Sequence, residues 1–443
     1  MTAQFLPPND ALRTTLHNEV HARPSARVRL PALIVYVAVL NHGVSKDMEL
    51  SHLQKLPGQQ GLGIEALHGN FLRLRLTGHT LKWERHTEFT RYSIVQPLPE
   101  SACLDAQNPN LLEHWLIDPL WLKSIPGSTV AAIQLCMMHA DLQAPDLLDR
   151  MQHWWGNAVL VASRMGNRPN GEPHSLAAAS FRIESDGFER LMVLAPQGTT
   201  EARAGRISRR LLELETYRLM ALRGLPISKQ ISPMLTECEA ALADITARME
   251  SKSDSDQSLL DSLVSLAARV ERSTAEHGYR FSATRAYDAL VSQRIAELRE
   301  RPIPDVQSVG DFLQRRMSPA MATVAACAQR LTSLSERVAR ASALLRTRVD
   351  IATEIQNQQL LAQLTRGQTL QLRLQSTVEG LSIAAISYYV ISLLLYAAKA
   401  LKAGGLHIEP EMAVGLLIPL VIWLVWRINQ KIHRSFDLDN HGP

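Results

Sequence analysis

One charged run in the N-terminal part of the chain has the residue types of a metal site. In the run WERHTEF, residues 83–89, two carboxylates flank an imidazole. If this run is a β-strand, Glu84, His86 and Glu88 project from one face, because successive side chains of a strand alternate. These groups can ligate a divalent cation, and His21 would be a further ligand. The same carboxylates could instead form structural ion pairs with nearby arginines: Arg23, Arg85 or Arg91.

A second unusual run, NEVHARP at residues 18–24, contains His21 and Arg23. A charged run bounded by Trp83 and Phe89 is expected to be partly buried, and buried charges need partners. We therefore expect NEVHARP to dock beside WERHTEF and to form one polar cluster with it. Arg23 is the expected counter-ion, since its planar guanidinium can donate two hydrogen bonds to one carboxylate.

No enzyme motif accompanies these residues. The sequence has no glycine-rich phosphate loop, no His-Glu-x-x-His zinc motif and no Gly-x-Ser-x-Gly elbow. A formal net charge of +4 on 443 residues is too small to indicate nucleic-acid binding. The cysteines lack paired spacing, which fits a reducing compartment and argues against a cysteine-based metal site: Cys103, Cys136, Cys238 and Cys327. Neither an enzymatic activity nor a nucleic-acid partner is expected.

The elements that must position WERHTEF belong to a region of mixed strand and helix patterns. This region predicts an α/β domain over residues 1–200. Asp186-Gly187 is a candidate hairpin turn. Helices are predicted at residues 47–56 and 111–123. Strands are predicted at residues 32–40, 71–77, 80–95, 129–138, 158–165, 180–184 and 190–194.

A long helical region follows residue 200, where apolar residues recur at helical spacing and strand patterns almost disappear. Breaks are indicated at residues 224–226, 251–255 and 301–304. The sequence therefore predicts roughly three long helices. They form a helical hairpin region over residues 201–304 and a stalk helix over residues 305–380.

The stalk helix carries an apolar seam. Its residues alternate three and four positions apart, as in a coiled coil: Leu331, Leu334, Val338, Ala341 and Leu345. A lone amphipathic helix would leave such a seam in water. We therefore expect a homo-oligomer joined through the stalk and the apolar segment after it, where small residues allow close helix packing: Gly380, Ala384 and Ser387.

Two uncharged apolar segments near the C-terminus, residues 381–398 and 412–426, predict membrane spans. At a rise of about 1.5 Å per residue, the first covers most of a hydrocarbon core about 30 Å thick. The second ends in Trp423 and Trp426, which are typical of a membrane interface. The spans are joined by a loop at residues 399–411 and followed by a tail at residues 427–443.

The distribution of basic residues predicts the orientation. Five Lys or Arg residues flank the spans on the side of the chain termini: Arg366, Arg373, Arg427, Lys431 and Arg434. Two lie in the loop, Lys399 and Lys402. Residues 1–24 carry charges throughout and lack the apolar region of a signal peptide. We therefore expect a two-span protein of the bacterial inner membrane with both termini in the cytoplasm.

Four runs together resemble a bacterial family of uncharacterised membrane-anchored proteins, one of the domains of unknown function: NEVHARP, WERHTEF, LLELETYR at residues 211–218 and TVEG at residues 377–380. The resemblance covers essentially the whole chain. It implies membrane anchoring, without an activity or a ligand.

The order of parts also resembles the CorA class of magnesium transporters, in which a stalk continues into a pore-lining span. That class carries Gly-Met-Asn at the end of the first span, where this chain has Ala398-Lys399-Ala400. The pore candidates would be acidic residues: Glu379, Glu409 and Glu411. Two functions are therefore expected as alternatives. The first is a membrane-anchored sensing or scaffolding protein with a cytosolic ligand or partner, and the second is a CorA-like ion pathway.

Overall fold

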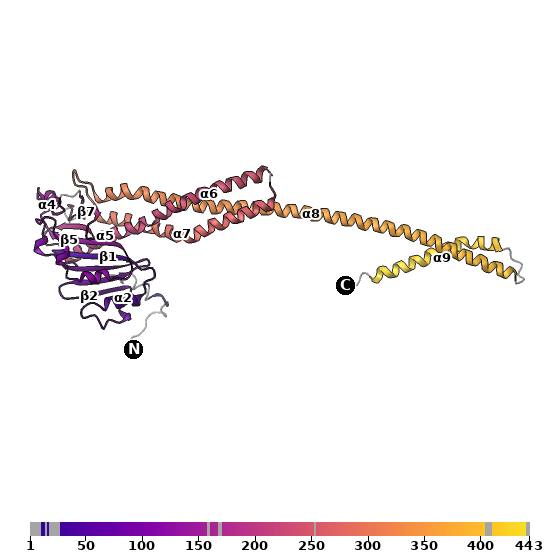
Figure 1. Cartoon of the computed structure of the whole chain (residues 1–443), viewed down its shortest axis with the longest axis horizontal. Helices are drawn as coiled ribbons and strands as arrows, with labels where there is room; N and C mark the ends of the chain where they lie inside the picture. Colours follow the sequence, from indigo (N-terminus) through magenta and orange to yellow (C-terminus); the bar gives the residue numbers. More distant parts are fainter. Residues whose placement is uncertain are drawn as a thin grey trace. The chain divides into compact units, whose positions relative to one another are not determined.

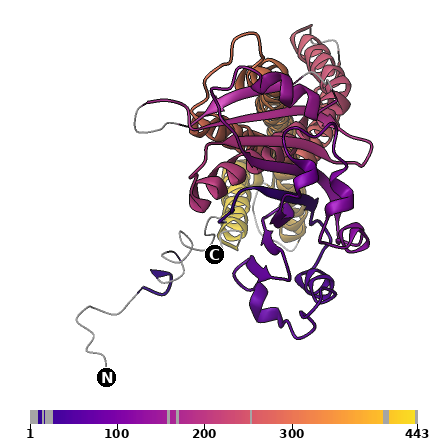
Figure 2. The ribbon, with the colours of Figure 1, turned by 90° about the vertical axis from the view of Figure 1, so that its left-hand side faces the viewer.

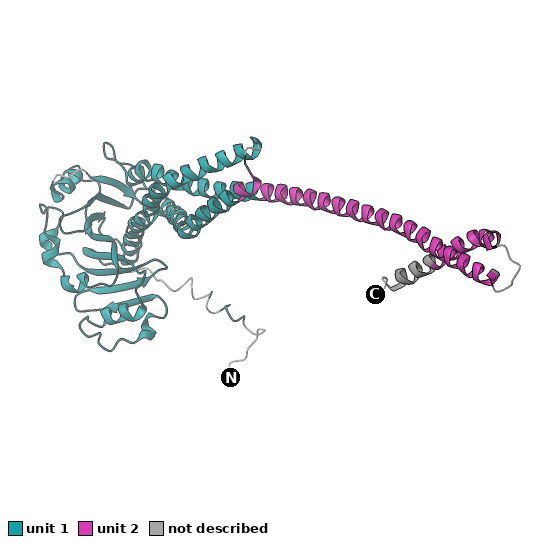
Figure 3. Cartoon of the chain, turned by 45° about the vertical axis from the view of Figure 1, so that its right-hand side comes forward, with its two compact units in different colours: residues 1–254, 261–342 teal, residues 255–260, 343–443 magenta. Residues whose placement is uncertain are grey.

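The computed structural model describes residues 10–13, 16, 27–156, 160–166, 171–251, 254–403 and 410–439. The chain divides into two compact units (Figure 3). Unit 1 comprises Met1–Asp254 and Asp261–Ser342, and unit 2 comprises Ser255–Leu260 and Ala343–Pro443. The predicted fold class is confirmed, because an N-terminal α/β sheet domain is followed by long helices.

Unit 1 is built on one eight-stranded sheet of order β2-β3-β4-β1-β5-β8-β7-β6. Neighbouring strands are antiparallel except β5 and β8, which are parallel. The strands are β1 (Ala32–Leu40), β2 (Phe71–Arg75), β3 (Thr80–Arg85), β4 (Phe89–Pro97), β5 (Ser128–His139), β6 (Val161–Met165), β7 (Ser175–Ile183) and β8 (Glu189–Ala195).

Both faces of the sheet are covered. On one face Trp83 joins a hydrophobic core with Leu53, Trp121 and Trp154, which come from three short helices. These helices are α2 (Lys46–Leu53), α3 (Pro119–Lys123) and α4 (Leu147–Trp154). The other face is covered by α5 (Glu201–Leu222), whose Thr216 lies 2.7 Å from the hydroxyl of Tyr36 in β1. Figure 2 looks onto the strands, with the long helices of unit 1 behind them.

The central strand β1 shows how this burial follows from sequence. Leu33, Val35 and Val37 belong to the core on the first face. Ile34 and Tyr36, which alternate with them, are also buried. A strand covered on both faces needs apolar residues at every position, so its sequence reads as a continuous apolar run.

The outer edge of β6 is occupied by the connection between two long helices. Arg164 exchanges two backbone hydrogen bonds with Arg301, at 2.8 and 3.1 Å. The amide of Ala162 donates to the carbonyl of Gln307 at 3.0 Å, and the amide of Gly166 donates to that of Leu298 at 2.9 Å. The backbone groups that an edge strand would leave open are therefore satisfied within the same chain.

Four helices, rather than three, occupy the described residues from 201 to 403. They are α5, α6 (Gly224–Ser251), α7 (Asp256–Leu298) and α8 (Val309–Ala403). The predicted break at residues 224–226 separates α5 from α6. In unit 1, α8 contacts α6, and Arg330 donates to both carboxylate oxygens of Glu239 at 3.1 and 2.8 Å. Leu331, Leu334 and Val338 of the predicted seam are buried within the chain itself.

Unit 2 contains the rest of α8 and α9 (Pro410–Asp439), which folds back across the end of α8 (Figures 1 and 3). Two helical segments are long and apolar enough to cross a membrane, with mean hydropathies of 1.9 within Val309–Leu401 and 1.8 within Pro410–Ile428. Large apolar side chains of these segments are exposed, among them Leu381, Tyr388 and Leu393.

Candidate functional site

WERHTEF is a hairpin, not the single strand predicted over residues 80–95. Strand β3 ends at Arg85, and β4 begins at Phe89. The amide of His86 donates to the carbonyl of Phe89 at 2.8 Å and closes the turn. Glu84 therefore lies in a strand, whereas His86 and Glu88 lie in the turn, and the three side chains do not share a strand face.

Glu84 lies in a buried layer of charges between the sheet and α5. It is 1 % exposed and directly opposite Arg91 on the neighbouring strand. The guanidinium of Arg91 donates to one carboxylate oxygen of Glu84, and the ammonium of Lys82 lies 3.0 Å from the other. Of the two predictions for Glu84, the structure shows the ion pair with Arg91.

The same layer reaches two helices. Glu213 of α5 accepts from Arg91 at 3.2 Å and from Arg294 of α7 at 2.8 Å. Arg294 also donates to both oxygens of Glu297 at 2.8 and 2.9 Å. A chain of alternating charges therefore links the sheet, α5 and α7, all within unit 1.

Charge pairing decides the protonation of Glu84. Burial alone would raise the pKa of this carboxyl, but the positive charges of Arg91 and Lys82 outweigh that effect and hold the pKa at about 2. Burial lowers the pKa of Lys82, against the opposing effect of Glu84. Arg91 remains charged, because Glu84 and Glu213 raise its pKa despite burial.

Glu88 and His86 have other partners. Glu88 pairs with Arg280 of α7, and both side chains are largely buried. The ring of His86 stacks on Phe89, with centroids 4.5 Å apart. The hairpin turn is thus a second contact between the sheet and α7.

The metal hypothesis includes His21 as a further ligand, and His21 lies outside the described residues, as do Arg23 and the rest of NEVHARP. Among the residues that the structure does describe, no group of His, Cys, Asp and Glu is arranged to hold a metal ion. Glu84 and Glu88 each face cations instead. A divalent-metal site at His21, Glu84, His86 and Glu88 stays a prediction.

A second buried acidic cluster was not predicted. Glu189 of β8 and Glu215 of α5 are both buried, and Arg218 donates to both oxygens of Glu215. Burial, followed by the nearby charge of Glu215, raises the pKa of Glu189 to about 9. The sequence does contain an indication of this cluster in the motif LLELETYR. Two glutamates interrupt its leucine run, at positions of α5 that face the sheet.

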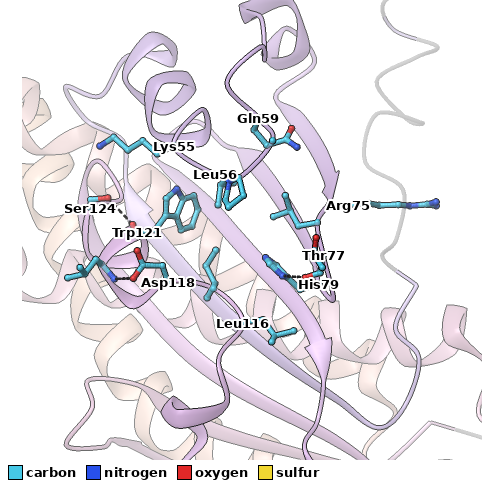
Figure 4. Close-up of a pocket in the computed structure, with 15 residues that line it drawn as sticks. Lys55, Leu56, Gln59, Arg75, Thr77, His79, Leu116, Asp118, Trp121 and Ser124 are labelled. Carbon is cyan, nitrogen blue, oxygen red and sulfur yellow. Dashed lines mark hydrogen bonds between the residues drawn. The ribbon is translucent and has the colours of Figure 1, made fainter.

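A pocket in unit 1 with a volume of about 850 Å³ lies beside α3 and the β2–β3 turn. Figure 4 shows Leu56 and Trp121 on one side and Thr77 and His79 on the other, while Arg75 extends away. The Nδ1 of His79 lies 3.1 Å from the carbonyl of Thr77, and its Nε2 is buried without a hydrogen-bond partner in the described structure. The lining of the pocket combines apolar side chains with polar ones.

The pore candidates lie in unit 2. Glu379 is partly exposed in α8, just before the first apolar segment, and Glu411 is exposed in the first turn of α9. Glu409 lies outside the described residues. A pore requires several copies of the chain around an axis, so these assignments stay predictions.

A comparison with curated proteins found no match. A family model does match, over residues 8–436, and thus covers nearly the whole chain. The chain therefore belongs to the family described as "Protein of unknown function (DUF3422)".

Proposed function

We propose that this protein is a membrane-anchored sensor or scaffold whose sheet domain binds a small amphipathic anion in the pocket beside α3. The volume of about 850 Å³ carries this proposal. Pockets that bind small molecules usually have volumes of about 300–1,000 Å³ and combine apolar walls with a few polar groups. The proposed role is binding rather than catalysis.

The lining residues suggest the class of ligand. Leu76, Leu116 and Trp121 offer apolar surface, and Leu120 is 73 % exposed at the rim. Lys55 supplies a positive charge, and the imidazole of His79 has a free nitrogen. A compact apolar body with one carboxylate or similar group matches this lining.

The binding proposal can be tested on the detergent-solubilised full chain. Ligand-observed NMR with a library of small aromatic and branched carboxylic acids should detect binders at millimolar concentration. Leu120→Glu should abolish the signal by placing a negative charge at the rim. The matched control is Ile183→Glu, because Ile183 is 79 % exposed and does not line the pocket. Absence of binders, or equal binding by both variants, would refute the proposal.

The membrane part of the proposal places two spans in the inner membrane, with the sheet domain and both termini in the cytoplasm. The two apolar helical segments and the flanking basic residues support it. A single cysteine between the spans, introduced into a cysteine-free chain, should react with an impermeant maleimide only from the periplasm. Labelling of that cysteine from the cytoplasmic side alone would reverse the topology.

A homo-oligomer is proposed through the part of α8 that belongs to unit 2. There Ile351, Leu361 and Leu364 are 56, 62 and 63 % exposed. Burial of such a surface against a second copy is favourable by about 25 cal/mol per Å² of apolar area. Light scattering in mild detergent should show more than one chain, and a monomer would exclude this arrangement.

A CorA-like ion pathway through Glu379, Glu409 and Glu411 is the alternative. The same light-scattering sample decides between the two functions, since a pore along the first span requires a ring of several chains. A dimer would exclude the pore and leave the sensing proposal intact.

A further inference from the structure

A second, smaller cavity lies between the sheet and α5, apart from the pocket beside α3. Its floor is one row of residues across four neighbouring strands, directly opposite one another: Arg73, Lys82, Ser93 and Tyr36. Its roof is a stretch of α5: Gly205, Ser208, Arg209 and Leu212. Sheet and helix therefore both contribute to its walls.

The charge of this cavity is unbalanced. Its lining includes five cationic side chains: Arg27, Arg73, Lys82, Arg91 and Arg209. Among the lining residues that the structure describes, Glu84 is the single carboxylate. Arg73 and Lys82 face each other directly across β2 and β3, and like charges in that position destabilise a sheet. An anion between them would turn this repulsion into attraction.

Hydrogen-bond donors remain available at the floor. Lys82 is 7 % exposed, and its ammonium contacts Glu84, which leaves N–H donors to spare. The side chain of Arg91 is 5 % exposed and contacts the cavity between its bonds to Glu84 and Glu213. Ser93, which also lines the cavity, adds a hydroxyl group at the floor. Buried cations and hydroxyls together are the donors that bind oxyanions.

The size of the cavity limits the ligand. Its volume is about 40 Å³. One buried water needs about 10–15 Å³ of such space, so the cavity admits a few waters or one tetrahedral oxyanion. A larger ligand, such as a phosphomonoester, can place only its phosphate group inside the cavity.

We propose that this cavity is a binding site for a tetrahedral oxyanion, either inorganic phosphate or the phosphate group of a small phosphomonoester, held between Arg73 and Lys82 of the sheet and Arg209 of α5. This site goes beyond the ligand pocket proposed above. A bound anion joins the sheet to α5 and competes with Glu213 for Arg209, whose Nε lies 3.7 Å from that carboxylate.

The test uses the full chain in detergent and a buffer free of phosphate and sulfate. Isothermal titration calorimetry with inorganic phosphate should give saturable binding to the wild type. Arg209→Gln should weaken it at least tenfold. The matched control Arg206→Gln removes the same charge from an exposed position on the same helix, outside the cavity, and should leave affinity within twofold.

Two further measurements complete the test. Arg73→Gln, at an exposed position, should also weaken phosphate binding without threatening the fold. Glycerol 3-phosphate should compete with inorganic phosphate if the natural ligand is a phosphomonoester, and should fail to compete if only the free ion fits. Leu120→Glu in the pocket beside α3 should bind phosphate normally, which separates the two sites. No saturable binding, or equal affinities for Arg209→Gln and Arg206→Gln, would overturn the proposal.

Discussion

Arg91 and Glu213 are separated by 122 residues in the sequence, yet the guanidinium of Arg91 lies 3.2 Å from the carboxylate of Glu213. Both residues are about 95 % buried, and they join β4 to α5. Removal of one partner from a buried ion pair leaves the other charge without compensation, and this usually costs about 3–5 kcal/mol. The contact therefore ties the stability of the sheet to the position of α5.

Glu213→Gln should lower the free energy of unfolding of unit 1 by about 3 kcal/mol, because Arg91 and Arg294 both lose a charged partner. Urea denaturation followed by near-ultraviolet circular dichroism would measure it. Glu271→Gln, at an exposed position of α7, is the matched control and should change stability by less than about 0.5 kcal/mol. Equal effects would show that the buried layer contributes no special stability.

Glu189→Gln should make the protein more stable relative to the wild type as pH rises. The folded state raises the pKa of Glu189 to about 9. The protonated carboxyl therefore contributes fully to stability below about pH 4.5, and this contribution is lost as pH approaches 9. The neutral amide does not ionise. The free energy of unfolding of Glu189→Gln, relative to that of the wild type, should therefore grow by roughly 2 kcal/mol between pH 5 and 9. This figure is reduced because Glu189 and Glu215 titrate together. A pH-independent difference would contradict the proposed protonation of Glu189.

His52 should destabilise the fold in acid. Its ring stacks on Trp121, with centroids 4.2 Å apart, and burial followed by the charge of Lys55 lowers its pKa to about 4. The fold favours the neutral imidazole, so stability is fully present above pH 6.5 and is lost as pH falls toward 4. In His52→Phe, the decrease in the free energy of unfolding between pH 6.5 and 4 should be smaller by about 2 kcal/mol. His42→Phe, at an exposed site, should leave the acid dependence of stability unchanged.

Arg280→Gln should loosen the turn between β3 and β4, because it removes the partner of Glu88. Amide hydrogen exchange should become faster at residues 86–89, and stability should fall by about 1–2 kcal/mol. Arg285→Gln changes an exposed arginine of the same helix and should not affect exchange in the turn. Unchanged exchange in Arg280→Gln would mean that the turn holds its shape without α7.

The fully buried strands could be predicted from the sequence, because their continuous apolar pattern is local. The predicted strand at residues 32–40 coincides with β1, and the one at residues 129–138 lies within β5. The turn at residues 86–88 was missed because it lacks glycine, asparagine and proline, the residues that usually indicate a hairpin. The predicted helix at residues 111–123 is divided, since Asp118 caps a new helix that begins at Pro119.

The candidate site was predictable only in part. Glu84 and Arg91 occur in one hairpin, so their pairing follows from a local pattern. Glu213 and Arg294 come from distant helices, and nothing in a single sequence indicates which buried charges will meet. The two cavities likewise depend on how α3 and α5 approach the sheet, and this is a tertiary property.

The occupied edge of β6 has a consequence for the order in which the chain can fold during synthesis. The segment that pairs with β6, residues 298–307, leaves the ribosome more than a hundred residues after β6 itself. Until then the nascent sheet exposes an unpaired edge, so it can associate with other nascent chains. A fragment that ends at residue 200 would keep this exposed edge permanently, and we expect it to aggregate where the whole chain stays soluble in detergent.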